Sequence, residues 1–167
     1  MRNQYDNKDC LEMGLTAEQM FVIAAHKKQF LCTESTKEEN INSHIDFWIH
    51  RDDKSYSVDV KAAKRIQRSD KDVNYEKLWI ELHSVRGDNK GWLLDGKADF
   101  IAFEQKDHFI ITNRKQLIDF VRETVVNVRV KSPIDALYTM YTREGRPDIL
   151  TLINSKDIID ISKIWRN

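Results

Sequence analysis

Apolar and polar residues alternate along residues 44–61, HIDFWIHRDDKSYSVDVK, in two short runs separated by a charged turn. The alternating apolar positions are Ile45, Phe47, Ile49, Tyr56, Val58 and Val60. A period of two is typical of strands that bury one face. The pattern therefore predicts a β-hairpin, and it places Asp59 and Lys61 together on the other face.

The length of the turn decides which residues face each other across this hairpin. A turn with an even number of residues pairs positions whose numbers sum to 105, which sets Asp46 opposite Asp59. Directly opposed residues have Cβ atoms about 5 Å apart, and two like charges there are destabilising unless a positive charge lies between them. A metal ion would supply that charge. An odd turn would shift the register by one residue and send one carboxylate to the opposite face.

A helix is predicted ahead of the hairpin. Residues 1–14 are expected to be an irregular lead-in, and Thr16 with Gln19 makes a capping-box pattern before apolar residues at helical spacing. We expect this helix to end near Leu31, and the polar residues 33–43 to connect it to the hairpin.

The chain after the hairpin alternates between strand and helix patterns, which is typical of the α/β class. Strands are expected at 78–83, 98–104 and 108–112, a flexible loop at 86–91, a helix from an Asn113 N-cap to about Asn127, a mixed helix-or-strand segment at 134–142, a loop at 143–147, a strand at 148–153 and a short helix from Ser155 to near Trp165. The elements together predict one mixed sheet flanked by helices.

The strand at 78–83 carries a further acid. Its alternation places Glu81 and Trp79 on the face that bears the hairpin carboxylates, so Glu81 is a candidate site residue, although a glutamate on an exposed strand face is equally ordinary. Trp48 is expected on this face as well. Packing beneath a covering helix is a better expectation for the two indoles than stacking on bases.

Composition favours a single globular domain. The 167 residues contain only two Pro and five Gly to mark linkers, so we expect one domain over residues 1–167, with a core at about 16–127 and a C-terminal extension at about 128–167. Basic and acidic residues balance at 27 each, so the chain lacks the overall basicity that favours nonspecific nucleic-acid binding. Basic residues nevertheless gather at 61–71. The candidate phosphate contacts there are Lys64, Arg65, Arg68 and Lys71, and a solvated charged loop is the ordinary alternative.

Several other classes of function lack support. The chain has no P-loop, no dinucleotide-binding glycine pattern and no nucleophile elbow, so no nucleotide cofactor is expected. No apolar run is long enough to span a membrane, and a cytoplasmic location is expected, in which Cys10 and Cys32 stay free thiols. A zinc site using His44 or His83 with Asp46 lacks a recognised spacing.

Asp46, followed thirteen positions later by Asp59-Val60-Lys61, resembles the signature of the PD-(D/E)XK nuclease superfamily. Ile45 stands where the nominal Pro of that signature would be. The resemblance covers roughly residues 16–104 and implies a restriction-endonuclease-like fold. It also implies that Asp46, Asp59 and the Val60 carbonyl bind Mg²⁺, for which Mn²⁺ would substitute, and that Lys61 positions the attacking water.

The same resemblance suggests two further acids and a class of substrate. Members of the superfamily commonly supply an acid from a helix before the sheet, which matches Glu18, and a polar group from a later strand, which matches Glu81. Glu18 at a helix start would also be favoured by the helix dipole alone. The size and acid spacing are similar to those of small resolvase-type or phage-encoded enzymes, so branched DNA and a homodimer are expected.

These observations predict a Mg²⁺-dependent endonuclease that hydrolyses phosphodiester bonds in DNA. Three alternatives remain open. In the first, the chain is a catalytically degenerate member of the fold that only binds nucleic acid or protein. In the second, it is a ribonuclease. In the third, its hairpin is a chance match in a noncatalytic interaction domain.

Overall fold

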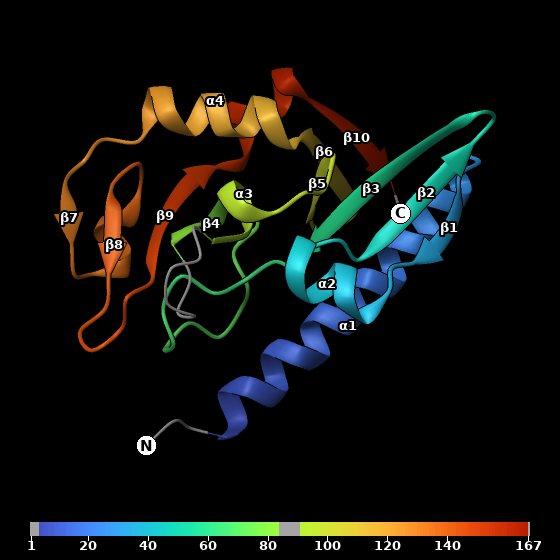
Figure 1. Cartoon of the computed structure of the whole chain (residues 1–167). Helices are drawn as coiled ribbons and strands as arrows, with labels where there is room; N and C mark the ends of the chain where they lie inside the picture. The colour runs from blue at the N-terminus through green and yellow to red at the C-terminus, as the bar shows by residue number, and fades with distance from the viewer. Residues whose placement is uncertain (1–3, 84–90, 167) are drawn as a thin grey trace.

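The computed structural model describes residues 4–83 and 91–166, with side chains described from residue 12 onward (Figure 1). The described chain forms two sheets. The larger contains, in spatial order, β1 (Leu31–Glu34), β2 (Phe47–Arg51), β3 (Lys54–Lys61), β5 (Phe100–Glu104), β6 (His108–Asn113) and β10 (Ser162–Arg166). The smaller contains β4 (Lys77–His83), β9 (Ile149–Asn154), β8 (Met140–Thr142) and β7 (Arg129–Val130).

Helices flank both sheets, which confirms the α/β class. They are α1 (Gln4–Lys27), α2 (Lys37–Ser43), α3 (Gly91–Asp95), α4 (Arg114–Thr124) and the short 3-10 helices η1 (Pro133–Ala136) and η2 (Ser155–Ile161). Each sheet is mixed, because β3 pairs with β5 in parallel and β7 pairs with β8 in parallel, whereas the remaining pairs of strands are antiparallel.

The hairpin β2–β3 has the predicted register. Five pairs whose numbers sum to 105 run from Phe47 opposite Val58 to Arg51 opposite Lys54. Asp52, in the two-residue turn, has a φ of 55°, a left-handed conformation that the primed turns of tight hairpins need. The local alternation and the even turn were therefore sufficient to fix which residues face each other.

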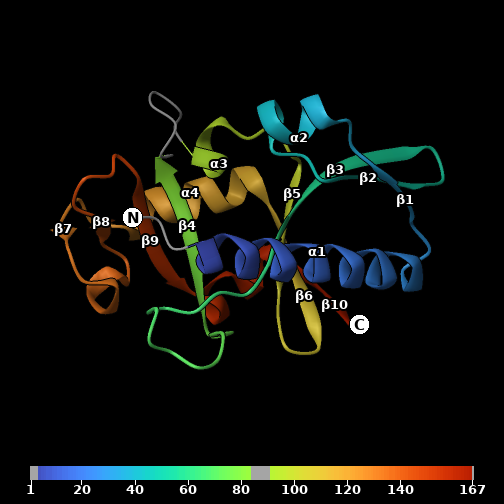
Figure 2. The ribbon, with the colours of Figure 1, turned by 90° about the horizontal axis from the view of Figure 1, so that it is seen from below.

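Two apolar clusters pack on opposite faces of the large sheet. One lies beneath α1, where the Phe21 ring contacts Phe47, Phe109 and Trp165 at centroid distances of 5.7–6.0 Å. The other lies under α3, α4 and the small sheet, and includes Ile80, Trp92, Leu93, Ile101, Phe103, Leu117 and Ile153. In Figure 1, α4 runs across the top and α1 lies on the lower side; Figure 2 shows α1 from below, with α4 behind it. The large sheet thus lies between two packed layers.

The first helix is longer at its start than predicted. Helix α1 begins at Gln4 and runs through Gly14, so the irregular lead-in at 1–14 is wrong for the described residues 4–14. Thr16 is inside the helix, where its hydroxyl donates to the Glu12 carbonyl at 3.0 Å instead of capping an N-terminus. A single interior glycine costs a helix only about 1 kcal/mol, which is too little to end it. The helix ends at Lys27, and Leu31 already belongs to β1.

The segment 33–43, predicted as a connection, contains part of β1 and all of α2. Helix α2 begins with a capping box: the Glu39 backbone N–H donates to the Thr36 hydroxyl at 3.2 Å, and the Thr36 backbone N–H donates to the Glu39 carboxylate at 2.8 Å. The pattern Thr-x-x-Glu was present in the sequence and signals a helix start. His44 ends the helix in the left-handed conformation, with a φ of 51°.

The prediction of one sheet is wrong because β4 leaves the large sheet. Strand β4 pairs with β9 in the small sheet, and β5 takes the place beside β3. Alternation shows that residues 78–83 form a strand with one apolar face, and Leu78 and Ile80 are indeed buried, but it carries no information about the partner strand.

The C-terminal region differs in its last element. The expected short helix is the 3-10 helix η2, whose N-cap position is Asn154 and not Ser155, without a side-chain hydrogen bond at that cap; residues 162–166 form β10 beside β6. Trp165 is 8% exposed and stacks on Phe30 at 5.2 Å, so burial of the indole holds this strand in place.

The remaining elements agree with the prediction in outline. Asn113 caps α4 by accepting hydrogen bonds from the Lys115 and Gln116 amides, and α4 ends at Thr124. The mixed segment 134–142 contains the end of η1 and all of β8. The predicted loop at 86–91 lies outside the described residues except for Gly91. Among the described helices, none is long and apolar enough to cross a membrane.

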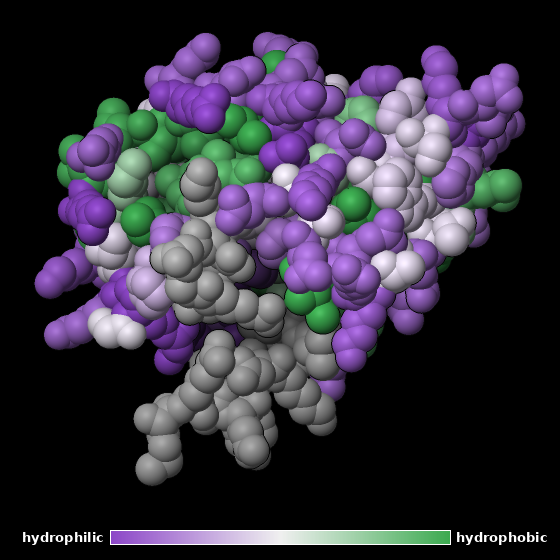
Figure 3. Space-filling view, viewed as in Figure 1, coloured by the Kyte–Doolittle hydropathy of each residue, from purple (hydrophilic) through white to green (hydrophobic). Residues whose placement is uncertain are grey.

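Hydrophilic side chains cover most of the face shown in Figure 3, with an apolar area on the side of α4 and the small sheet. The segment after α4 and the adjoining η1 contain three large apolar side chains that are more than half exposed, namely Val126, Val128 and Ile134.

Candidate active site

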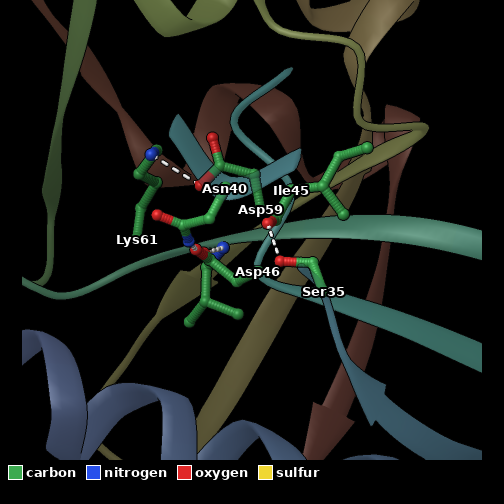
Figure 4. A network of polar contacts seen from close by, with 7 residues as sticks. Ser35, Asn40, Ile45, Asp46, Asp59 and Lys61 are labelled. Atoms are coloured by element: carbon green, nitrogen blue, oxygen red, sulfur yellow. Dashed lines mark hydrogen bonds and ion pairs between the residues drawn. The ribbon is translucent and has the colours of Figure 1, made fainter. Parts of the chain in front are cut away.

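Asp59 and Lys61 meet on the face of β3 that looks toward the small sheet. The Lys61 Nζ lies 2.6 Å from the Asp59 Oδ1, and the Asp59 side chain is 3% exposed (Figure 4). The parallel partner strand β5 sets Ile101 beside Asp59 and Phe103 beside Lys61. The ion pair therefore lies against apolar side chains, where water screens its charges weakly.

Asp46 stands directly before β2 and is held by two hydrogen bonds. Its Oδ1 accepts from the Asn40 Nδ2 at 2.6 Å, and its Oδ2 accepts from the Val60 backbone N–H at 2.7 Å. Its own backbone N–H donates to the Val58 carbonyl at 2.9 Å. Helix α2 and strand β3 thus fix one carboxylate, and Figure 4 shows it beside Asp59 and Lys61.

Burial and a neighbouring carboxylate disfavour the charged form of Asp59. The pKa of Asp59 is raised to about 7, mainly by burial; the Asp46 carboxylate also raises it, and the Lys61 ammonium lowers it. The Asp59 Oδ2 is buried and has no hydrogen-bond partner among the described residues. A buried carboxylate oxygen without a donor is costly, and a bound cation would remove that cost.

Glu18 reaches the electrostatic neighbourhood of this site from α1. Burial raises its pKa, the charges of Asp46 and Glu34 raise it further, and the Lys61 charge lowers it. Because α1 begins before Thr16, Glu18 lies well inside the helix and the helix dipole at a first turn does not explain its position.

Glu81 approaches from the small sheet and not from the sheet that carries the hairpin. Burial raises its pKa, whereas the charges of Lys61, Lys64 and Arg143 lower it. The close contact of α3 with β4 supports this position: Gly91 has a φ of 69°, and a Cβ atom there would lie 2.5 Å from the Glu81 carbonyl oxygen. Only glycine fits this approach.

Trp92 forms the floor under Lys61. The Lys61 Nζ lies 4.9 Å from the centre of the Trp92 ring, and Trp92 is 6% exposed. A cation over an indole face is attracted by the ring quadrupole. The indole therefore holds the ammonium beside Asp59 while it keeps one side of the site dry.

The candidate phosphate contacts lie on the segment that leaves β3. Lys64, Arg65, Arg68 and Lys71 are all exposed. An isolated bridge joins Lys64 to Asn74, so the two ends of the segment are joined to each other, and the Trp79 Nε1 on β4 donates to the Arg65 carbonyl at 3.0 Å.

The two tryptophans expected on one face lie on different sheets. The Trp48 Nε1 donates to the Glu39 carboxylate at 3.2 Å, and Trp48 packs against the core under α3. Trp79 lies on the small sheet, beside Tyr141. The prediction that they share a face assumed a single sheet, and it is wrong because β4 belongs to the small sheet.

The candidate metal ligands at the site are carboxylate oxygens, which suit a magnesium ion better than zinc. Within residues 12–83 and 91–166, no three side chains of His, Cys, Asp or Glu come close enough together to hold a metal ion. Mg²⁺ is commonly held by one or two carboxylates and keeps several waters, so Asp46 and the unpaired Oδ2 of Asp59 fit it. Cys32 is a free thiol whose pKa burial raises to about 11, and the Cys10 side chain lies outside the described residues.

Asn40 and Trp92 were not predicted as part of the site. The Thr36-x-x-Glu39 capping box would have placed Asn40 on a helix that leads directly into Asp46, whereas no local signal shows that Trp92 lies under Lys61. A comparison of this chain with protein-family models, curated proteins and solved structures finds no significant match. A function is therefore inferred from the geometry of the site alone.

Proposed function

We propose that the chain is a Mg²⁺-dependent endonuclease that hydrolyses phosphodiester bonds in DNA. The observation that carries this proposal is the buried Asp59 carboxylate, which pairs with Lys61 through one oxygen, lies beside Asp46 and leaves its second oxygen without a partner among the described residues. Lys61 and Asp46 alone would be an ordinary surface arrangement. The buried, incompletely satisfied Asp59 points to a cation as the missing partner.

Each residue then has a defined task. Asp46 and Asp59 hold the ion, with the Val60 carbonyl as a third candidate ligand. When bound, Mg²⁺ would neutralise charge on the phosphate and supply sites for its oxygens and for the attacking water. Lys61 donates a hydrogen bond that orients this water, and Trp92 and Asp59 hold the ammonium in place. Glu18 and Glu81 add negative charge around the ion from α1 and β4.

The test uses the purified chain with supercoiled plasmid, single-stranded DNA, a four-way junction and single-stranded RNA, each with Mg²⁺, with Mn²⁺ or with EDTA. We expect metal-dependent cutting of DNA by the wild type and none by Lys61→Met, which controls for contaminating nucleases. Cutting of RNA alone would make the chain a ribonuclease. Binding of DNA without cutting in any metal would make it a degenerate member that only binds.

Asn40→Leu is expected to lower the cleavage rate at limiting Mg²⁺ about 10- to 100-fold. The substitution removes the amide that holds the Asp46 Oδ1, and loss of a group that orients a metal ligand typically costs that factor in metal affinity or activity. The measurement is a Mg²⁺ titration of the cleavage rate, in which the loss should shrink as Mg²⁺ rises. The control is Asn127→Leu, a change at an exposed asparagine after α4. An equal loss at all Mg²⁺ concentrations would contradict a role through Asp46.

A further inference from the structure

The loop between β8 and β9 brings two arginines next to the basic segment that leaves β3. Glu81 on β4 pairs with Leu150 on β9, and Leu150 pairs with Tyr141 on β8, so these three residues form one row across the small sheet. Arg143 follows Tyr141 by two positions, and Arg146 lies in the same loop. The loop therefore starts at the end of the sheet where Glu81 faces Lys61.

Trp79 joins this loop to the segment 62–72. Its Nε1 donates to the Arg65 carbonyl at 3.0 Å, and its ring lies 5.7 Å from the Tyr141 ring, tilted by 40°. One indole thus contacts the basic segment on one side and β8 on the other. The segment that leaves β3 and the strand that leads into the β8–β9 loop are therefore joined through one packed side chain.

Arg143 is anchored, and charged groups of both signs lie near it. It pairs with Asp148, which is 2% exposed, while its Nε has no hydrogen-bond partner among the described residues. Burial and the positive charges of Arg146 and Arg68 lower the pKa of Arg143, whereas Tyr141 and the Glu81 charge raise it. Arg146 from the same loop and Arg68 from the segment that leaves β3 therefore each repel Arg143, and a bound anion would relieve this repulsion.

We propose that Arg68, Arg143 and Arg146 form a second-sheet arginine cluster that binds the nucleic-acid backbone and extends the phosphate-binding surface from Lys61 and Lys64 across the small sheet. This inference rests on the proposed function, since it assigns the path of the DNA past the same site. The fitting ligand is a polyanion and not a single phosphate, because the cations follow one another from β3 to the β8–β9 loop. Asp148 neutralises part of the charge of Arg143, so Arg68 and Arg146 are the two positions at which the cluster is tested.

The test measures binding of a fluorescent 30-base-pair duplex by the full chain in EDTA, between about 50 and 200 mM salt. Arg68→Gln and Arg146→Gln should each weaken binding about 3- to 10-fold and lower the slope of log affinity against log salt by about 0.9, the value for one lost phosphate contact. Arg146→Lys should keep the slope. The control Arg122→Gln removes the same charge from α4, where Arg122 is 71% exposed, and should change neither quantity.

Unchanged slopes for Arg68→Gln and Arg146→Gln, an equal loss for Arg122→Gln, or no binding by the wild type would each overturn the arginine cluster. The cluster and the nuclease fail separately. If the protein cuts DNA in a metal-dependent way but its affinity does not change on substitution of Arg68 or Arg146, the nuclease proposal stands and the cluster is rejected. Binding that depends on both arginines, without cutting in any metal, keeps the cluster and rejects the nuclease.

Discussion

Asp59→Asn is expected to lower the rate of metal-dependent DNA cleavage by at least about 10³-fold. The asparagine side chain has the same size and keeps an oxygen that can accept from Lys61. It removes the negative charge of the carboxylate, whose Oδ2 is the unpaired oxygen proposed to bind the metal. A metal ion contributes several kcal/mol of charge stabilisation in the transition state, and each 1.36 kcal/mol corresponds to about tenfold in rate. Loss of one of two carboxylate ligands should remove most of this contribution.

The measurement is single-turnover cleavage of plasmid DNA at saturating protein in Mg²⁺ and in Mn²⁺. The matched control is Asp119→Asn, which changes a 70% exposed carboxylate on α4 and should leave the rate within about twofold. Near-wild-type cleavage by Asp59→Asn would remove Asp59 from the site and, with it, the observation on which the proposed function depends.

The same substitution should make the metal-free protein more stable at pH 8, by about 2 kcal/mol. The pKa of Asp59 in the folded chain is about 7, above the value of 3.8 that the group has when it is solvated. Between these values the folded state holds a proton that the unfolded chain has lost. The wild type therefore loses stability as the pH rises from about 4 to about 7, and the full cost remains above pH 7. Asparagine does not titrate, so the gain should be large at pH 8 and small near pH 4.

Urea unfolding in EDTA at pH 5 and pH 8 measures this effect. One pKa unit corresponds to 1.36 kcal/mol, and the weaker attraction between asparagine and Lys61 offsets part of the gain, which sets the expected size at about 2 kcal/mol. Asp119→Asn should change the free energy of unfolding by less than about 0.5 kcal/mol at either pH. A lower stability of Asp59→Asn at pH 8 would show that the charged carboxylate stabilises the fold without a metal.

A stabilised but inactive variant would indicate a functional site. Replacing a residue that serves only the fold by one of the same shape lowers the stability of the protein. Replacing a group that is retained for chemistry often raises the stability, because such a group carries a cost. The two measurements on Asp59→Asn together therefore distinguish a nuclease from a chance match in a binding domain.

The parts of the fold that the sequence predicts well are those whose information is local. The β2–β3 register follows from a period of two and from a two-residue turn, and five pairs confirm it. The Asn113 cap follows from one side chain that reaches the next turn of backbone. The meeting of Asp59 with Lys61 needs only that both lie on one face of one strand.

The parts that were wrong depend on contacts between distant segments. The pattern of β4 is equally compatible with either sheet, and only its pairing with β9 decides. The sequence of β10 was predicted as helix because its alternation is short. The strand is stabilised by Trp165, which packs against Phe21 and Phe30. The approach of Glu81 to Lys61 from a second sheet, and of Arg143 to Arg68, cannot be seen in any window of the sequence.

The path of the chain through β4 has a consequence for folding. Strand β4 lies between β3 and β5 in the sequence, yet its partner β9 follows α4, so neither sheet is made of one continuous segment. Pairing of this kind raises the contact order, which slows folding because distant segments must meet before contacts form. It also ties the two sheets together, since unfolding the small sheet would release the connections on both sides of β4. We therefore expect both sheets to unfold in a single cooperative transition.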